Sequence, residues 1–376
     1  MIRGRVPHAV LLVGPAGIGK TTLALDLAAG LLCTSPDPAT RPCGACRACR
    51  LVASGSHPDV HRLGPEGPGR QVVIGGPGSK ARGVRDLIAD LALMPVEGGA
   101  RVAVIESAQR MHDDAQAALL KTLEEPPSGV TLVLCADAEE PLLPTIRSRC
   151  ARLRLGPVAA AAIETVLAQH GLDDPALAAR LARIADGRPG RALAWASDPD
   201  ALRRRDQLTR VLLDLTAAGP AERLAAVRGA AADASALADL EDRSSATPSP
   251  VVAGGASGRP APAGEPAADA EDDAEGGDRG RAPAAARRRA ADALVRIWID
   301  LTRDLLLVRH GAPASLRDPR LLEEYATVLG ALDPGRSTAF LDRLGRALVL
   351  LGGNVSPDLV LDDLALAWPS TADVAA

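Results

Sequence analysis

The feature that most limits how this chain can fold is a glycine-rich turn near its amino terminus. Residues 14–21 read GPAGIGKT and match the phosphate-binding pattern G-x-x-x-x-G-K-[ST] at every fixed position. A short apolar strand expected at residues 8–15 runs into the turn, and a helical pattern follows from Lys20 to Leu32. A strand that ends in a glycine turn and opens a helix is the context in which this pattern binds phosphate groups.

Each part of this turn has a chemical role in holding a nucleoside triphosphate. The glycines let backbone N–H groups curl around phosphate oxygens, and the helix N-terminus adds positive potential. Lys20 is expected to reach the β- and γ-phosphates, and the Thr21 hydroxyl to hold Mg²⁺. The alternative is a structural turn that holds no ligand. The expected nucleotide-binding residues are Gly14, Gly17, Gly19, Lys20, Thr21 and Thr22.

Two further apolar strands are expected at residues 101–105 and 130–135, with a helix between them at residues 113–123. Apolar strands that alternate with helices indicate a parallel sheet covered on both faces. The sequence therefore predicts an α/β P-loop domain over residues 1–155.

The remainder of the chain is expected to be helical. Alanine- and leucine-rich periodicity predicts a small helical domain at residues 156–199 and a third, all-helical domain at residues 200–376. Residues 241–293 contain no Leu, Ile, Phe, Trp or Tyr, so they cannot bury enough apolar surface to offset their ordering entropy. We interpret this run as a disordered insertion within the third domain; a linker between two domains is the alternative.

Composition excludes several classes of protein. The chain has a net charge of −4 and contains three Trp, one Tyr and one Phe among its 376 residues, which argues against a strongly basic DNA binder or a base-stacking platform. It contains no stretch of 18 apolar residues, and its first residues lack the pattern of a signal peptide. We therefore expect a cytoplasmic protein without a membrane association.

Four of the six cysteines lie within 17 residues of one another: Cys33, Cys43, Cys46 and Cys49. Such a cluster in a cytosolic chain points to a metal rather than to disulfides. Four thiolates at this spacing suit tetrahedral Zn²⁺ in a closed structural site, and an iron–sulfur cluster is the alternative. The sequence predicts a zinc module at residues 33–49 inside the P-loop domain.

The chain closely resembles the AAA+ clamp-loader subunits of bacterial DNA polymerase III. Four elements carry the resemblance: the phosphate loop, the cysteine module after its helix, the run LLKTLEEPP at residues 119–127, and Ser-Arg-Cys at residues 148–150. The specific motifs cover about residues 5–200, and the resemblance extends more weakly through the later helices as an expected collar domain.

The resemblance implies an assembly and a role for one arginine. Members of the family form a hetero-oligomeric ring of five subunits that opens the sliding clamp and places it on primed DNA. The implied partners are the gamma/tau and delta subunits, with the clamp and DNA reached through the complex. In the family, the arginine of Ser-Arg-Cys reaches ATP bound on the neighbouring subunit, and here that residue is Arg149. Such an arginine neutralises charge on the transferring phosphoryl group.

The resemblance also locates the positions that hydrolyse ATP, and here they depart from the family. The strand-end acid and the water-activating residue fall at Glu106 and Ser107. Glu106 could still hold magnesium, but a serine hydroxyl is too weakly basic to activate water. The polar sensor position falls at Ala136. The sensor arginine falls at Gly190, next to Arg191.

An intact loop, lost hydrolytic groups and a retained Arg149 resemble the delta-prime type of subunit. We expect weak or absent ATPase activity in the chain itself, although ATP and Mg²⁺ could bind. The loop begins after only 13 residues, which predicts a truncated start or a mis-assigned initiator Met, less cover for adenine and weaker nucleotide binding. An active gamma/tau-type ATPase is the first alternative, and a stand-alone P-loop nucleotide kinase is the second.

Overall fold

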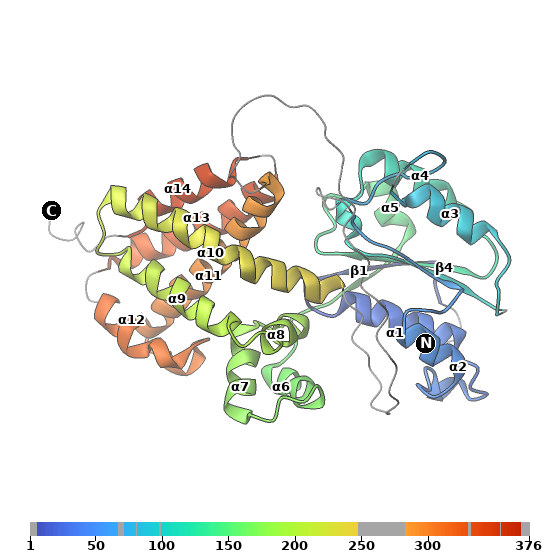
Figure 1. Ribbon diagram of the computed structural model, residues 1–376, viewed down its shortest axis with the longest axis horizontal. Helices are drawn as coiled ribbons and strands as arrows, with labels where there is room; N and C mark the ends of the chain where they lie inside the picture. Colours follow the sequence, from blue (N-terminus) through green and yellow to red (C-terminus); the bar gives the residue numbers. More distant parts are fainter. Residues whose placement is uncertain are drawn as a thin grey trace, which may run out of the picture.

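The computed structural model describes residues 6–66, 71–79, 81–97, 99–246, 283–329, 332–353 and 355–369. Figure 1 shows an α/β domain beside a larger helical body. The expected α/β P-loop fold followed by a helical region is confirmed.

The α/β domain is built on a five-stranded parallel sheet in the order β2-β3-β4-β1-β5. Because all strands are parallel, their carboxyl ends share one edge, where loops of α/β proteins place their ligands. β1 and β4 are direct neighbours, so the loop after β1 lies beside the end of β4. The strands are β1 (Ala9–Val13), β2 (Val60–Leu63), β3 (Arg101–Ile105), β4 (Val130–Ala136) and β5 (Ala151–Arg154).

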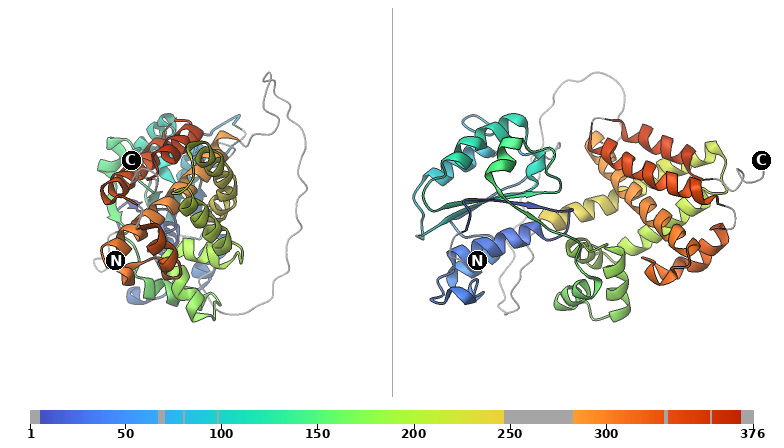
Figure 2. Two further views of the ribbon diagram at one scale, coloured as in Figure 1. Left: turned by 90° about the vertical axis from the view of Figure 1, so that its left-hand side faces the viewer. Right: turned by 180° about the vertical axis from the view of Figure 1, so that it is seen from behind.

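Helices cover both faces of this sheet, as the view from behind in Figure 2 shows. Alternate side chains of each central strand point to opposite faces: Leu11 packs toward α3, α4 and α5, whereas Leu12 packs toward α1 and α2. The elements are α1 (Lys20–Leu32), η1 (Pro38–Thr40), α2 (Arg47–Ala53), α3 (Val84–Ala92), η2 (Ala108–Arg110), α4 (Asp113–Glu124) and α5 (Pro144–Arg149).

The helical body is stabilised by one continuous core. Buried side chains from α6 through α14 form a single cluster, which includes the mutually packed rings of Trp298, Phe340 and Trp368. We call α6–α8 the lid and α9–α14 the collar. The lid helices are α6 (Ala160–Gln169), α7 (Pro175–Ile184) and α8 (Pro189–Ala196). The collar elements are α9 (Ala201–Asp214), α10 (Pro220–Ala246), α11 (Ala284–Arg309), η3 (Pro313–Ser315), η4 (Pro319–Leu321), α12 (Leu322–Leu329), α13 (Pro334–Gly352) and α14 (Pro357–Ala367).

The insertion expected at residues 241–293 was too long at both ends. Helix α10 continues to Ala246, and α11 begins at Ala284 with Ala290, Ala291 and Ala293 buried. Alanine has the highest helix propensity and fits a close helix contact, so the absence of large apolar residues did not prevent helix formation. Residues 247–282, the middle of the expected insertion, lie outside the described part of the chain.

Candidate functional site

The phosphate loop connects β1 to α1 at the carboxyl edge of the sheet. The N–H of Gly14 donates to the carbonyl of Ala136 at the end of β4, over 3.1 Å. Gly17 and Gly19 adopt left-handed φ angles of 78° and 103°, which residues with a Cβ rarely reach. The sequence pattern is thus used as expected: two glycines turn the chain, and the helix begins at Lys20.

Lys20 is buried at the base of this loop. Its ammonium group donates to the carbonyls of Gly14 (2.6 Å) and Pro15 (3.0 Å) and to Oδ1 of Asp137 (2.7 Å). An ammonium group has three hydrogens, so these three acceptors use its full capacity. A phosphate group can therefore contact Lys20 only if it displaces one of them.

Asp137 is the site residue that sequence reasoning missed. The expected sensor position, Ala136, is completely buried and apolar, whereas the next residue carries the carboxylate that meets Lys20. Gln109 fixes Asp137 from two sides: its Nε2 donates to Oδ2 at 2.9 Å, and its Oε1 accepts the Asp137 N–H at 3.1 Å. The available signal was the position of Asp137 directly after an apolar strand beside the phosphate loop.

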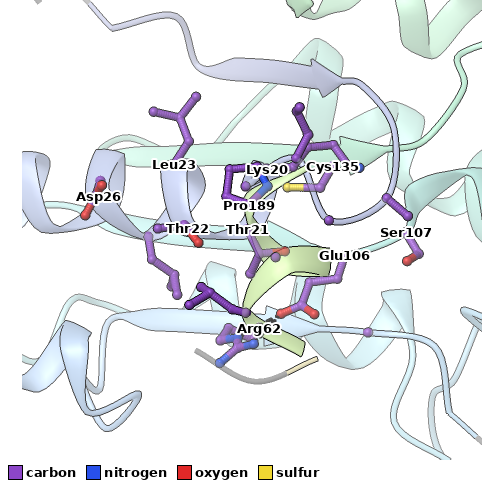
Figure 3. A pocket seen from close by; sticks show the side chains of 18 of the residues that line it. Lys20, Thr21, Thr22, Leu23, Asp26, Arg62, Glu106, Ser107, Cys135 and Pro189 are labelled. Atoms are coloured by element: carbon purple, nitrogen blue, oxygen red, sulfur yellow. Dashed lines mark hydrogen bonds and ion pairs between the residues drawn. The ribbon is translucent and has the colours of Figure 1, made fainter. Parts of the chain in front are cut away.

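Glu106 and Ser107 follow β3 at the same edge of the sheet. The Glu106 carboxylate accepts two hydrogen bonds from Arg62 of β2, at 2.9 and 2.5 Å. Figure 3 shows Lys20, Thr21, Arg62 and Glu106 around one cavity. Ser107 has a left-handed φ of 50°, a conformation that costs a residue with a Cβ about 1 kcal/mol. Ser107 also lines this cavity.

The cavity has a volume of about 990 Å³ and is bounded by the α/β domain and the lid. The phosphate loop, Thr22 and the end of β3 form one side, and the lid contributes Val166, His170 and Leu193. Among the described residues that line it, none is Phe, Tyr or Trp. A nucleotide base held here would pack against aliphatic and imidazole groups rather than on a Phe, Tyr or Trp ring.

The start of α8 touches the phosphate loop directly. The N–H of Gly190 donates to the carbonyl of Gly17 over 2.8 Å. Arg191 points away from the loop, with its Nε on Oε1 of Glu241 and its guanidinium carbon 4.3 Å from the ring centre of Trp195. Burial, together with the charge of Arg191, lowers the pKa of Arg188 to about 9. The guanidinium of Arg191 is thus engaged by Glu241 and Trp195.

The four clustered cysteines come together as expected. Each offers a sulfur atom, and all four atoms lie within 4.8 Å of one another. The backbone N–H groups of Ser35, Cys46 and Cys49 donate to the sulfurs of Cys33, Cys43 and Cys46, at 3.3 to 3.5 Å. A tetrahedral ion with bonds of about 2.3 Å fits such a group, so these residues could hold a metal.

Backbone hydrogen bonds favour the charged form of the Cys46 sulfur. Burial alone would raise the pKa of this thiol, but donation from the amides of Cys49 and Thr34 outweighs burial and lowers the pKa to about 5. Thiolates are the form that binds a metal ion. Histidines His57 and His61 stand outside this group: His57 faces Glu97, and His61 faces Asp90.

Arg149 lies at the end of α5 on the surface of the α/β domain. Its Nη2 is 2.5 Å from Oε1 of Glu124, the last residue of α4, and its Nη1 donates to the carbonyl of Thr145 at 3.0 Å. About a third of its side chain is exposed. The Arg149 guanidinium is thus held in place by Glu124, which is itself half exposed. The guanidinium is separate from the chain's own phosphate loop.

Comparison with known proteins agrees with this architecture. Residues 1–159 match the family model described as "DNA polymerase III, delta subunit". The delta' subunit of DNA polymerase III from Pseudomonas aeruginosa is 42% identical over 175 residues, which cover 46% of this chain and 51% of that protein. This chain is similar to the delta' subunits of DNA polymerase III. It spans about half the length of the delta' relative that it matches.

The tau subunit of DNA polymerase III is a second relative, with lower sequence identity. The Escherichia coli tau subunit is 33% identical over 189 residues, which cover 49% of this chain and 28% of that protein. A DNA polymerase III gamma subunit-related protein from Thermotoga maritima has a solved structure that covers 96% of this chain and 93% of its own, with 18% identity and a TM-score of 0.41. The relatives of this chain by sequence thus include delta' and tau subunits of DNA polymerase III. Within the described residues, no helix combines the length and the hydropathy needed to cross a bilayer.

Proposed function

We propose that this chain is a delta'-type subunit of the DNA polymerase III clamp loader, with a nucleotide site that hydrolyses ATP slowly or not at all. One observation carries the proposal: the position that the family resemblance assigns to the water-activating residue holds a serine, Ser107, and it follows a Glu106 that is already paired with Arg62. A hydroxyl cannot take a proton from water at neutral pH, and an ion-paired carboxylate is a poor base. The residues can still hold phosphate and Mg²⁺ through Lys20 and Thr21.

Within the ring, we assign Arg149 to the ATP site of the neighbouring subunit. Its surface position and its exposed partner Glu124 support this role, because a half-exposed ion pair is worth only about 0 to 1 kcal/mol and is readily exchanged for a phosphate contact. The expected partners are gamma/tau and delta subunits, with the sliding clamp and primed DNA as the substrates of the complex.

The Arg149 assignment is tested by Arg149→Ala in a reconstituted complex with gamma/tau, delta and the clamp. Loss of an arginine finger lowers turnover at the affected site by about a thousandfold or more, so the contribution of that site to DNA-stimulated ATPase should disappear and clamp loading should slow. Arg152→Ala is the matched control, since this arginine lies on the exposed strand β5 and pairs with Glu139. Unchanged ATPase and clamp loading in the Arg149 variant would refute the role.

A tau/gamma-type ATPase is the second candidate, because the phosphate loop is complete and the tau relative aligns over half of this chain. A single-turnover assay on the full chain with Mg²⁺ and ATP separates the two. Hydrolysis at about 1 s⁻¹ or faster, a rate typical of active enzymes, would favour the second candidate. The zinc module is common to both proposals.

A further inference from the structure

The lid contacts the phosphate loop through a hydrogen bond between backbone atoms. At Gly190, a Cβ would lie 3.0 Å from the Gly17 carbonyl oxygen and 3.2 Å from the Gly17 Cα, closer than side chains normally approach. Glycine at position 190 therefore permits the 2.8 Å hydrogen bond between the two segments. Gly190 therefore accounts for two features. It leaves this position without a sensor arginine, and it allows the lid to contact the loop directly.

The next residue makes a contact in the opposite direction. The Arg191 Nε donates to Oε1 of Glu241 at 2.7 Å, and the side chain of Arg191 is only 3% exposed. Its guanidinium also stacks on Trp195, one turn further along α8, which adds a cation–π contact. Glu241 belongs to the collar helix α10. Two adjacent residues of α8 thus connect the loop to the collar.

Helix α10 is firmly fixed in the collar. It packs on α9, α11 and α14, and Figure 1 shows it reaching from the collar toward α8 and β1. Near its amino-terminal end, Arg223 donates to the carbonyl of Trp368 at 2.6 Å, and Arg228 forms an ion pair with Asp362 of α14. A displacement of the Glu241 end of α10 is therefore transmitted to the collar as a whole.

We propose that Arg191 and Glu241 are positioning residues that couple the phosphate loop to the collar through the start of α8. Their ion pair holds α8 at the angle at which Gly190 meets Gly17. Release of the pair loosens the start of α8 against the loop, while the apolar side chains of α8 remain in the core that it shares with α10. Coupling of this kind is reciprocal. A partner that moves α10 changes the affinity of the loop for nucleotide, and nucleotide changes the affinity of the protein for that partner by the same factor. The effect on nucleotide affinity rests on the proposed nucleotide site. The contacts of α8 with the loop and with α10 do not depend on it.

Amide hydrogen exchange on the full chain tests the geometry without nucleotide. In Glu241→Gln, peptides covering residues 9–25 should exchange about fivefold faster than in the unsubstituted chain, since a lid that is no longer held releases the Gly17 contact. Asp239→Asn is the matched control, because this carboxylate lies on the same helix and pairs with Arg289 of α11. Peptides from β4 serve as an internal reference for global stability.

A double-mutant cycle identifies the pair as the cause. Arg191→Gln should accelerate exchange in the loop as Glu241→Gln does, and the double variant should add nothing further. If the loop exchanges in Glu241→Gln as in the unsubstituted chain while the protein remains folded, or if the two effects simply add, the coupling is wrong.

Binding of ADP with Mg²⁺, measured by calorimetry, then tests the consequence. Glu241→Gln should change the dissociation constant about fivefold, whereas Asp239→Asn should leave it unaltered. Equal affinity in Glu241→Gln and the unsubstituted chain would refute the coupling. If the unsubstituted chain binds no nucleotide, the proposed nucleotide site fails, and the exchange experiment alone decides the coupling.

Discussion

Lys20 is the residue on which the state of the nucleotide site depends. Its three hydrogen bonds end on the Gly14 and Pro15 carbonyls and on Asp137, which lies 117 residues further along the chain. The two carbonyls belong to the loop itself. Asp137 is a carboxylate from outside the loop, and it competes directly with a phosphate group for Lys20. We therefore expect the affinity of the loop for nucleotide to depend partly on a residue outside the glycine motif.

Replacement of Asp137 by Asn should strengthen nucleotide binding. The amide keeps the size of the side chain but removes the negative charge, so Lys20 is more easily transferred to phosphate, and we expect the dissociation constant of ADP to fall about three- to tenfold. Isothermal titration calorimetry measures this directly. Glu139→Gln is the control, because Glu139 is two residues further on and pairs with Arg154. Weaker binding in Asp137→Asn would mean that Asp137 supports the ligand instead of competing with it.

The cysteine module is the element whose stability should depend on a metal. Its residues contain one short helix, α2, and η1, with few large apolar side chains, so a bound ion would supply much of the folding free energy of the segment. We expect elemental analysis to find about one zinc per chain. Cys46→Ser should lose the zinc and lower the midpoint of thermal unfolding.

The matched control for this prediction is Cys150→Ser. Cys150 is buried in the core on the opposite face of the sheet, so its loss can destabilise the protein without removing zinc. Absence of zinc from the unsubstituted protein, together with an unchanged unfolding midpoint in Cys46→Ser, would refute the metal site.

The individual elements differ in how far the sequence predicts them. Strands β1, β3 and β4 are almost fully buried and consist mainly of apolar residues. Their positions can therefore be predicted from the apolar runs in the sequence. The edge strands β2 and β5 read VHRL and ARLR; β5 is exposed along its whole length and carries no apolar periodicity. Their strand structure results from pairing with β3 and β1, which only the assembled sheet provides.

The site shows the same division between local and long-range information. The glycine turn and the cysteine cluster are local patterns, and the structure has both where the sequence predicts them. The contact of Lys20 with Asp137 joins segments more than a hundred residues apart, and that of Arg191 with Glu241 joins segments 50 residues apart. Neither pair has a fixed spacing, so no motif could predict them.

At the scale of the whole molecule, the collar is assembled from both sides of the segment that separates α10 from α11. Side chains of α10, such as Val227 and Leu237, belong to the same buried cluster as Trp298 of α11 and Leu364 of α14. The Arg228–Asp362 ion pair also joins the two sides. Continuity of the backbone between these helices is therefore not what holds the collar together.

Cleavage of the chain between α10 and α11 should leave the molecule associated. We expect a protease site inserted within residues 247–282 to be cut while the two fragments continue to elute together in gel filtration, because the shared core remains buried. Denaturing electrophoresis confirms the cut, and urea should then separate the fragments. Fragments that part in native buffer would contradict the single core.

All five aromatic residues of the chain, among them Trp195, Trp298 and Trp368, lie at position 195 or beyond. The α/β domain, including its phosphate loop, therefore contributes no tryptophan fluorescence. An unfolding curve followed by fluorescence reports on the lid and the collar, whereas far-ultraviolet circular dichroism reports on the sheet as well. Coincident curves from the two probes would show that the α/β domain and the helical body unfold as one cooperative unit.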